Sequence, residues 1–355
     1  MNDLREVFEM VTKQTEPDLD SWKKQEDRQR RRSRNRRIGA ILVAAAAAIA
    51  IGAFALASRP GSGKTSVTNP PAPSVPFVTT PPIGAQLVAP DGTPVRQFPG
   101  SFSERSSLQL SPDGTTLAYI SAGSVHTVRV DGSDDRTLTG AGNTNNGDAQ
   151  NHVVWSPDGS QLAYAYAGNI YVMNADGSDQ HAITHPPGGL GDYYPAWSID
   201  GTIAFWEGTP TGEDGGPIDS EIYTIPADGT GSPVRLTNDG GNPVSDIEPA
   251  WSPDGSRIAY WHGGALWIQW ADGTHRQDVY TAEGGVWAPS WSPDGKSIAF
   301  IAYVGNLPGG GAPVMQLRTI ELKTRRVTKL KMHSVTDWNG PQWVSDGEIL
   351  INRYN

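Results

Sequence analysis

The sequence predicts an all-β fold for residues 84–355, a six-bladed β-propeller, from three observations. The pentapeptide WSPDG occurs three times, and LSPDG and WSIDG are near-copies of it. Asp-Gly pairs recur along the chain in two interleaved series. The stretches between these pairs, such as QLAYAYA and RIAYWHG, alternate in side-chain character as a β-strand requires.

The Asp-Gly pairs predict the tight turns of this fold. In Ser-Pro-Asp-Gly, proline presets φ near about −65°, aspartate accepts local backbone hydrogen bonds, and glycine takes the positive φ that closes a hairpin. Each turn of the first series belongs to a unit of four short strands, so six such turns predict six four-stranded blades. The first series is Asp113, Asp158, Asp200, Asp254, Asp294 and Asp346; the second is Asp91, Asp131, Asp176, Asp228 and Asp272, with Lys323-Thr324 in the sixth place.

Residues 1–37 are predicted to form a short cytoplasmic helical segment that is amphipathic and basic. Its first part carries one apolar stripe, and a segment of this length cannot bury such a stripe by itself. We therefore expect the stripe to contact a cytoplasmic partner or the lipid surface. The stripe is formed by Leu4, Val7, Phe8 and Val11.

Residues 38–58 are predicted to be a transmembrane helix. The run IGAILVAAAAAIAIGAFALA has no charged residue, and a helix of that length spans a hydrocarbon core of about 30 Å. The arginine-rich run RQRRRSRNRR precedes it, which predicts a cytoplasmic N-terminus and an extracytoplasmic propeller in the cell membrane. A cleavable signal peptide that ends at Ala57 is the rival interpretation.

Residues 59–83 are predicted to be a proline-rich linker. The propeller follows, and the two ends of residues 84–355 are expected to share its last blade. One strand follows Asp346-Gly347, and two strands without a blade of their own, AQLVAP and PVRQF, precede the first complete blade. These two would supply the third and fourth strands of the last blade and leave no open edge.

Composition narrows the function classes. The chain has 355 residues, no cysteine and a net charge of −10, and residues 59–355 carry an even larger negative charge because residues 1–37 are basic. An acidic body of this kind argues against nucleic acid as a direct partner. The sequence has no G-x-S-x-G and no H-E-x-x-H motif, so it predicts no catalytic residue, no metal and no cofactor.

The repeat resembles that of TolB-type propellers, a family with WD-like Ser-Pro-Asp-Gly repeats. The unit W-S-P-D-G-x-x-[IL]-A-[FY], followed by I-Y-V-M-x-A-D-G-S, carries this resemblance over residues 84–355. It implies the propeller fold and a protein-binding platform. The arrangement of a cytoplasmic segment, one membrane span and an outer domain is also similar to membrane-bound anti-sigma factors.

A binding surface is expected where the loops into the innermost strands meet at the mouth of the central channel. Acidic and aromatic side chains there would suit a basic or amphipathic peptide, or a glycan. Simple solvation of loop ends is the alternative. The candidate residues are Arg105, His152, Asp192, Tyr193, Tyr194, Asp246, Glu248, Trp287, Trp338 and Asn339.

The sequence thus favours a non-enzymatic, membrane-anchored propeller that binds an extracytoplasmic protein, peptide or glycan. A second interpretation is a transmembrane signalling regulator, in which the propeller senses a ligand and residues 1–37 contact a sigma factor or a similar cytoplasmic protein. A hydrolase or lyase that acts at the channel mouth is the third.

Overall fold

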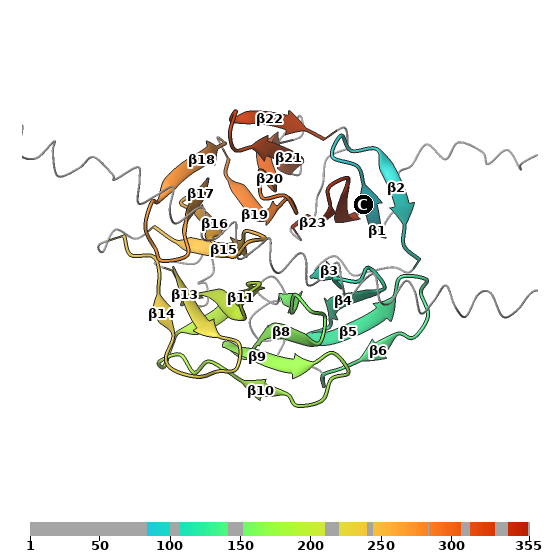
Figure 1. The fold of residues 1–355 in the computed structure, drawn as a ribbon, viewed down its shortest axis with the longest axis vertical. Helices are drawn as coiled ribbons and strands as arrows, with labels where there is room; N and C mark the ends of the chain where they lie inside the picture. The colour runs from blue at the N-terminus through green and yellow to red at the C-terminus, as the bar shows by residue number, and fades with distance from the viewer. Residues whose placement is uncertain are drawn as a thin grey trace, which may run out of the picture. The chain divides into compact units, whose positions relative to one another are not determined.

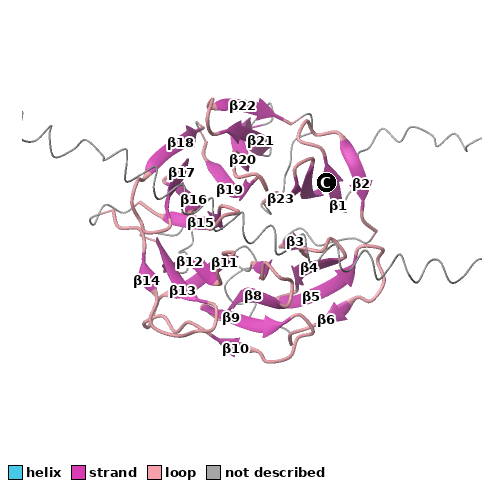
Figure 2. Ribbon diagram, viewed as in Figure 1, coloured by secondary structure: helices cyan, strands magenta, loops and turns pink. Residues whose placement is uncertain are grey.

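A computed structural model describes residues 84–99, 107–140, 152–209, 220–239, 244–282, 284–306, 313–330 and 340–353. Within these ranges the chain forms 24 strands in six four-stranded antiparallel sheets (Figure 1). Only strands and loops are drawn in the described part (Figure 2). The predicted six-bladed β-propeller is confirmed.

The strands follow the predicted repeat, and each sheet is one blade. Blades 1 to 3 are formed by β3 (Leu108–Leu110), β4 (Thr116–Ser121), β5 (Ser124–Arg129) and β6 (Arg136–Thr137); by β7 (Val153–Trp155), β8 (Gln161–Tyr166), β9 (Asn169–Asn174) and β10 (His181–Ala182); and by β11 (Gly191–Trp197), β12 (Thr202–Gly208), β13 (Glu221–Pro226) and β14 (Val234–Arg235).

Blades 4 to 6 repeat this order, and the last blade combines both ends of the propeller. They are formed by β15 (Asp246–Trp251), β16 (Arg257–His262), β17 (Ala265–Trp270) and β18 (Gln277–Thr281); by β19 (Val286–Trp291), β20 (Ser297–Asn306), β21 (Pro313–Glu321) and β22 (Arg326–Lys329); and by β23 (Gln342–Ser345), β24 (Glu348–Arg353), β1 (Gly84–Val88) and β2 (Pro94–Gln97).

The closure of the ring is as predicted. Strand β1 pairs with β24 in an antiparallel ladder from Gly84 opposite Arg353 to Val88 opposite Ile349. The buried ring of Phe98, which follows β2, then packs with Leu108 of the first blade in one apolar cluster. The β1–β24 ladder therefore joins the two ends of the propeller within the last blade, and apolar side chains fill the junction of that blade with the first one.

The turns have the predicted chemistry. In the turn at Asp158, the Ser156 hydroxyl donates to the carboxylate at 2.7 Å and the Ser160 backbone N–H donates at 2.9 Å. Gly159 closes the turn with a φ of 74°. The corresponding aspartates of blades 1, 4 and 5 accept the same two kinds of bond, so local turn geometry accounts for them.

The last inner hairpin is different. Strand β23 continues two residues past Trp343 and ends at Ser345, which pairs with Glu348. Its sequence is WVSDG, without proline, and Trp343 pairs with Ile349 across a hairpin one residue shorter than that between Trp155 and Leu162.

Tryptophans at the ends of the inner strands join neighbouring blades. The indole N–H of Trp291 in blade 5 donates to the Ala250 carbonyl of blade 4 at 3.0 Å. Trp251 does the same to Ala196 of blade 3 at 3.1 Å, and Trp155 to Gln109 of blade 1 at 3.3 Å. The ring therefore has hydrogen bonds between blades as well as apolar packing.

The topology gives the propeller two different faces. The first strand of each blade lies toward the centre, and the fourth strand lies at the periphery (Figure 1). We name the side where first strands begin the mouth face, and the side of the Asp-Gly turns the turn face. The glycine-rich insertions connect β12 to β13 and β20 to β21, so both leave from the mouth face.

Several predictions fall outside the described residues: the cytoplasmic segment 1–37, the transmembrane helix 38–58 and the linker 59–83. In the part of the chain that the structure does describe, no helix is long and apolar enough to span a membrane.

Candidate functional site

The candidate site is a ring of equivalent positions near the start of the innermost strands. Each position lies three residues before the Leu or Trp that precedes the inner hairpin, and the six residues at these positions differ. We name this set the rim ring. It consists of Ser107, His152, Tyr194, Glu248, Ala288 and Gly340.

Three rim positions have a left-handed backbone. Tyr194, Glu248 and Ala288 have φ values of 56°, 55° and 52°. The register of β11, β15 and β19 with its neighbour shifts at the same place, as in a β-bulge. A left-handed conformation at a non-glycine residue costs about 1 kcal/mol or more, and bulges of this kind redirect side chains.

The rim residues contact one another from blade to blade. The Ser107 hydroxyl and the His152 Nδ1 are 2.9 Å apart, and the His152 ring stacks on Tyr194 with centroids 4.0 Å apart. The Ala288 backbone N–H donates to the Glu248 carboxylate at 2.6 Å. A Cβ added to Gly340 would lie 2.3 Å from the Cβ of Ala288, so this position requires glycine.

Burial controls the charge of the rim. It lowers the pKa of His152 to about 3, so the imidazole is neutral at physiological pH. It raises the pKa of Glu248 to about 7, although the Ala288 N–H that donates to the carboxylate acts in the opposite direction. The rim ring thus presents aromatic and neutral polar groups, with one carboxyl group whose charge changes near neutral pH.

Two residues before the rim, blades 3 and 4 both carry aspartate, in opposite surroundings. Asp192 is 1% exposed, and its Oδ1 has no hydrogen-bond partner among the described residues. Its partner on β12 is Glu207, and Glu207 in turn is opposite Glu221 on β13. Burial, together with the charge of Glu207 and against a hydrogen bond from Thr184, raises the pKa of Asp192 to about 7.

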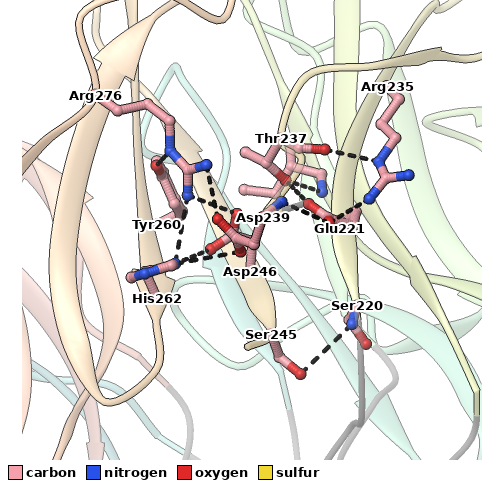
Figure 3. Close-up of polar contacts among 11 residues, drawn as sticks. Ser220, Glu221, Arg235, Thr237, Asp239, Ser245, Asp246, Tyr260, His262 and Arg276 are labelled. Carbon is pink, nitrogen blue, oxygen red and sulfur yellow. Dashed lines mark hydrogen bonds and ion pairs between the residues drawn. The ribbon is translucent and has the colours of Figure 1, made fainter. Parts of the chain in front are cut away.

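Asp246 is the equivalent of Asp192 in blade 4, and basic groups surround it (Figure 3). It is fully buried, the His262 Nδ1 lies 2.6 Å from its Oδ1, and the Arg276 guanidinium donates to its Oδ2 at 3.0 Å. Arg276 also donates to Asp239 and to the Tyr260 hydroxyl, both at 2.9 Å. Burial raises the pKa of Asp246 to about 6, and His262 and Arg276 limit that rise.

The same close-up contains a second ion pair, at the outer side of blade 3. Arg235 of β14 binds the Glu221 carboxylate, which also accepts the Thr237 hydroxyl at 2.5 Å (Figure 3). Glu221 is thus neutralised by the outer strand. Asp192, at the inner end of the same row of acids, has no comparable cation in the described chain.

Asp239, Asp246 and His262 have the residue types of a metal site, and their ligand atoms lie within 4.8 Å of one another. The Arg276 guanidinium bridges both carboxylates. The cluster therefore has its own positive charge, and a divalent cation would have to displace a bidentate arginine. The arrangement fits an internal ion-pair network better than a metal centre.

The structure relocates several predicted site residues. Asp192, Tyr193 and Asp246 were expected at loop ends, but they lie within β11 and β15 and are buried. Tyr193 packs against Trp206 with ring centroids 4.6 Å apart. The half-buried Trp287 lies over Gly285, where an added Cβ would come within 2.9 Å of its ring. Outside the described residues are Arg105, Trp338, Asn339, Leu4, Val7, Phe8 and Val11.

Sequence reasoning missed the residues that neutralise Asp246. His262 ends β16, the strand paired with β15, and Arg276 lies in the connection between β17 and β18 of the same blade. Asp239, a second acid that Arg276 binds, lies in the connection between blades 3 and 4. Blade 3 has Glu207 and Ser232 at the positions that correspond to His262 and Arg276. An alignment of these positions from blade to blade could have indicated that Asp246 has basic neighbours and Asp192 does not.

The described fold has relatives among solved structures. A putative TolB from Agrobacterium tumefaciens superimposes with a TM-score of 0.58 at 20% identity, over 77% of this chain and 98% of that one. A chain of a nidogen/laminin complex has a TM-score of 0.50 at 12% identity, over 70% and 93%. TolB from Acinetobacter baumannii has a TM-score of 0.47 at 16% identity, over 70% and 63%.

No family model and no curated protein matches the sequence. At identities this low the structural likeness establishes a TolB-like β-propeller fold, and the function has to be argued from the site itself.

Proposed function

We propose that this protein is a non-enzymatic binding propeller that captures a protein or peptide at the rim ring. A single observation supports this most strongly. Six equivalent positions around one axis carry six different side chains, while the turn and inter-blade positions repeat. Steric contact with Ala288 explains Gly340, but no contact that repeats in every blade explains the differing polar and aromatic residues of the ring.

The chemistry of the ring favours a ligand that is uncharged or basic and that can pack against aromatic side chains. Tyr194 of the ring and Trp287, which directly precedes the ring residue Ala288, are half-buried aromatic residues, the class that dominates protein-binding hot spots. His152 stacks on Tyr194 and is neutral, which adds flat apolar surface. Glu248 supplies a negative charge above neutral pH, so a lysine or arginine of the partner would have a counter-ion there. A glycan that stacks on these rings is the alternative ligand.

In the proposed setting, residues 38–58 anchor the protein in the cell membrane and the propeller is extracytoplasmic. The uncharged run and the arginines before it support this orientation. The proline-rich linker 59–83 would hold the propeller away from the bilayer. The ligand would then be an extracytoplasmic protein, peptide or glycan.

The test is capture by the full-length protein in its own membrane, with chemical crosslinking outside the cell. Tyr194→Asn combined with Trp287→Ala should reduce the captured partner about ten-fold or more, because it removes both half-buried rings. Asparagine is chosen at position 194 because it tolerates the left-handed backbone there.

The control is Val234→Ala on β14, an outer strand, where the side chain is 60% exposed. It should capture the same partner as the unchanged protein. Thermal melting of the rim variant within about 3 °C of the unchanged protein would show that the fold persists. Equal capture by the rim variant and the control would refute the proposed function.

A further inference from the structure

The turn face carries a groove between blades 2 and 3, far along the strands from the rim ring. Its volume is about 750 Å³. Apolar side chains make up much of its lining, and carboxylates lie among them. The apolar lining residues are Pro157, Trp197, Ile199, Pro226 and Ala227.

Ile199 is a departure from the repeat inside this groove. Four of the six inner hairpins have proline at this position, as Pro157 does in blade 2, but blade 3 has isoleucine. The turn of blade 3 is one residue shorter than that at Pro157, since the Ser198 N–H donates to the Thr202 carbonyl at 2.8 Å, and it has the hydrogen-bond pattern of the turn at Asp91, which carries Pro90 at the equivalent position. Proline therefore also fits this shorter turn, and the Ile199 side chain is 49% exposed. The turn therefore does not account for the isoleucine, whereas a ligand that covers it would.

The groove is also strongly acidic. Asp158, Asp200 and Asp228 line it, and its lining residues include no lysine or arginine. Hydroxyl and backbone hydrogen bonds from Ser156 and Ser160 keep the pKa of Asp158 below its ordinary value. The hydrogen bonds of the turns to Asp158 and Asp228 are accepted by Oδ1, which leaves an Oδ2 on each carboxylate for a ligand.

The equivalent groove between blades 1 and 2 is a natural comparison. Its volume is about 270 Å³, and Arg129 and Arg136 line it. Arg136 binds Asp134 at 2.7 Å, so part of the negative charge of this smaller groove is neutralised within the protein. The position of Arg136 is taken in the second groove by His181. The larger groove thus has no arginine in its lining, unlike the smaller one, and it has an exposed isoleucine.

We propose that the groove between blades 2 and 3 is a second docking site, which takes a basic peptide segment of a partner protein anchored by one aliphatic or aromatic side chain. The anchor covers Ile199 and Trp197, and lysine or arginine side chains of the segment bind the three aspartates. A second copy of this acidic propeller would bring like charges together, so the occupant is a different, basic chain.

The test uses the full-length protein in detergent micelles and fluorescence anisotropy. The probe is a labelled nine-residue peptide with a central leucine between lysines, and the control probe has glutamates in place of the lysines. The basic probe should bind with a dissociation constant on the order of 100 µM at about 50 mM salt, and the acidic probe should not bind. Higher salt should weaken the binding.

The variants distinguish this groove from a general acidic surface. Ile199→Pro introduces the residue that the turn of the same pattern carries at Pro90, so the turn is kept, and it should weaken binding about ten-fold. Asp228→Asn keeps an oxygen for the turn and should weaken binding about three-fold at low salt, whereas Asp272→Asn, the same change in the equivalent turn of blade 4, should not.

Unchanged binding by Ile199→Pro, an equal effect of the two asparagine variants, or no binding of the basic probe would each overturn the docking site. The rim variant Tyr194→Asn with Trp287→Ala should bind the probe normally. Loss of partner capture by that variant with normal probe binding would therefore separate the proposed function from the second site.

Discussion

The buried carboxyl group of Asp192 provides a quantitative test of the electrostatic argument. It lies in β11 opposite Glu207 and is 1% exposed, and its Oδ1 has no hydrogen-bond partner among the described residues. Burial is the main cause that raises its pKa to about 7. The substitution Asp192→Asn keeps the shape of the side chain and removes its charge.

The sign and size of the effect follow from proton linkage. The ordinary pKa of 3.8 applies in the unfolded chain, and the raised value applies in the folded protein. Between about pH 4 and pH 7 the folded protein therefore binds one more proton at this site, so the site's stabilisation is present below pH 4 and is lost as pH rises toward 7. At about 1.4 kcal/mol per pH unit the full loss would reach about 4 kcal/mol, and local relaxation should reduce it to about 2 kcal/mol.

The assay is urea unfolding of the full-length protein in detergent, followed by tryptophan fluorescence from pH 4.5 to pH 8.5. Asp192→Asn should match the unchanged protein near pH 4.5 and exceed its free energy of unfolding by about 2 kcal/mol at pH 8. Asp246→Asn is the matched comparison: the pKa of Asp246 is raised less, to about 6, because His262 and Arg276 limit the rise, so the gain in unfolding free energy at pH 8 should be smaller than that of Asp192→Asn. A pH-independent difference for Asp192→Asn, or a loss of stability at pH 8, would refute the reasoning.

Two further predictions concern the blade junctions and the N-terminal segment. Trp291→Phe removes the indole N–H that donates to Ala250 and should lower the free energy of unfolding by about 1 kcal/mol in the same assay. Trp155→Phe should lower it less, because the hydrogen bond of Trp155 is longer. Equal stability of the two variants and the unchanged protein would contradict this. If the protein signals, a peptide of residues 1–37 should retain a cytoplasmic transcription factor in a pull-down. Binding of this peptide to lipid alone would instead support a membrane anchor without signalling. In either case, mass analysis of the membrane-extracted protein should find residues 1–37 still attached.

The fold could be predicted because its determinants are local and repeated. A turn such as that at Asp158 is specified by four consecutive residues, and its geometry follows from the residue types alone. The closure of the last blade followed from strand counting, since the single strand after Asp346 needed partners and the two strands near Asp91 needed a sheet.

The candidate site could be predicted only in part, because its properties depend on partners far apart in sequence. Asp192 and Asp246 occupy the same position in the repeat, and the sequence analysis treated them alike. Their surroundings differ through Glu207 and His262, which the strand register brings opposite to them. Arg276 lies between β17 and β18, so the sequence around Asp246 does not predict this contact.

Blade 3 holds both unusual features, the uncompensated Asp192 on one face and the exposed Ile199 on the other. Both features destabilise the sheet that contains them, so this sheet would not fold well by itself. In the closed ring, however, contacts with the blades on both sides stabilise it. Trp251 of the next blade donates to the Ala196 carbonyl between the two features, and the apolar cluster around Phe205 joins blade 3 to its neighbours. The ring can therefore keep an unfavourable residue wherever binding requires it, provided that these inter-blade contacts remain. Departures from the repeat that no scaffold contact explains are consequently the best guide to where such a propeller binds.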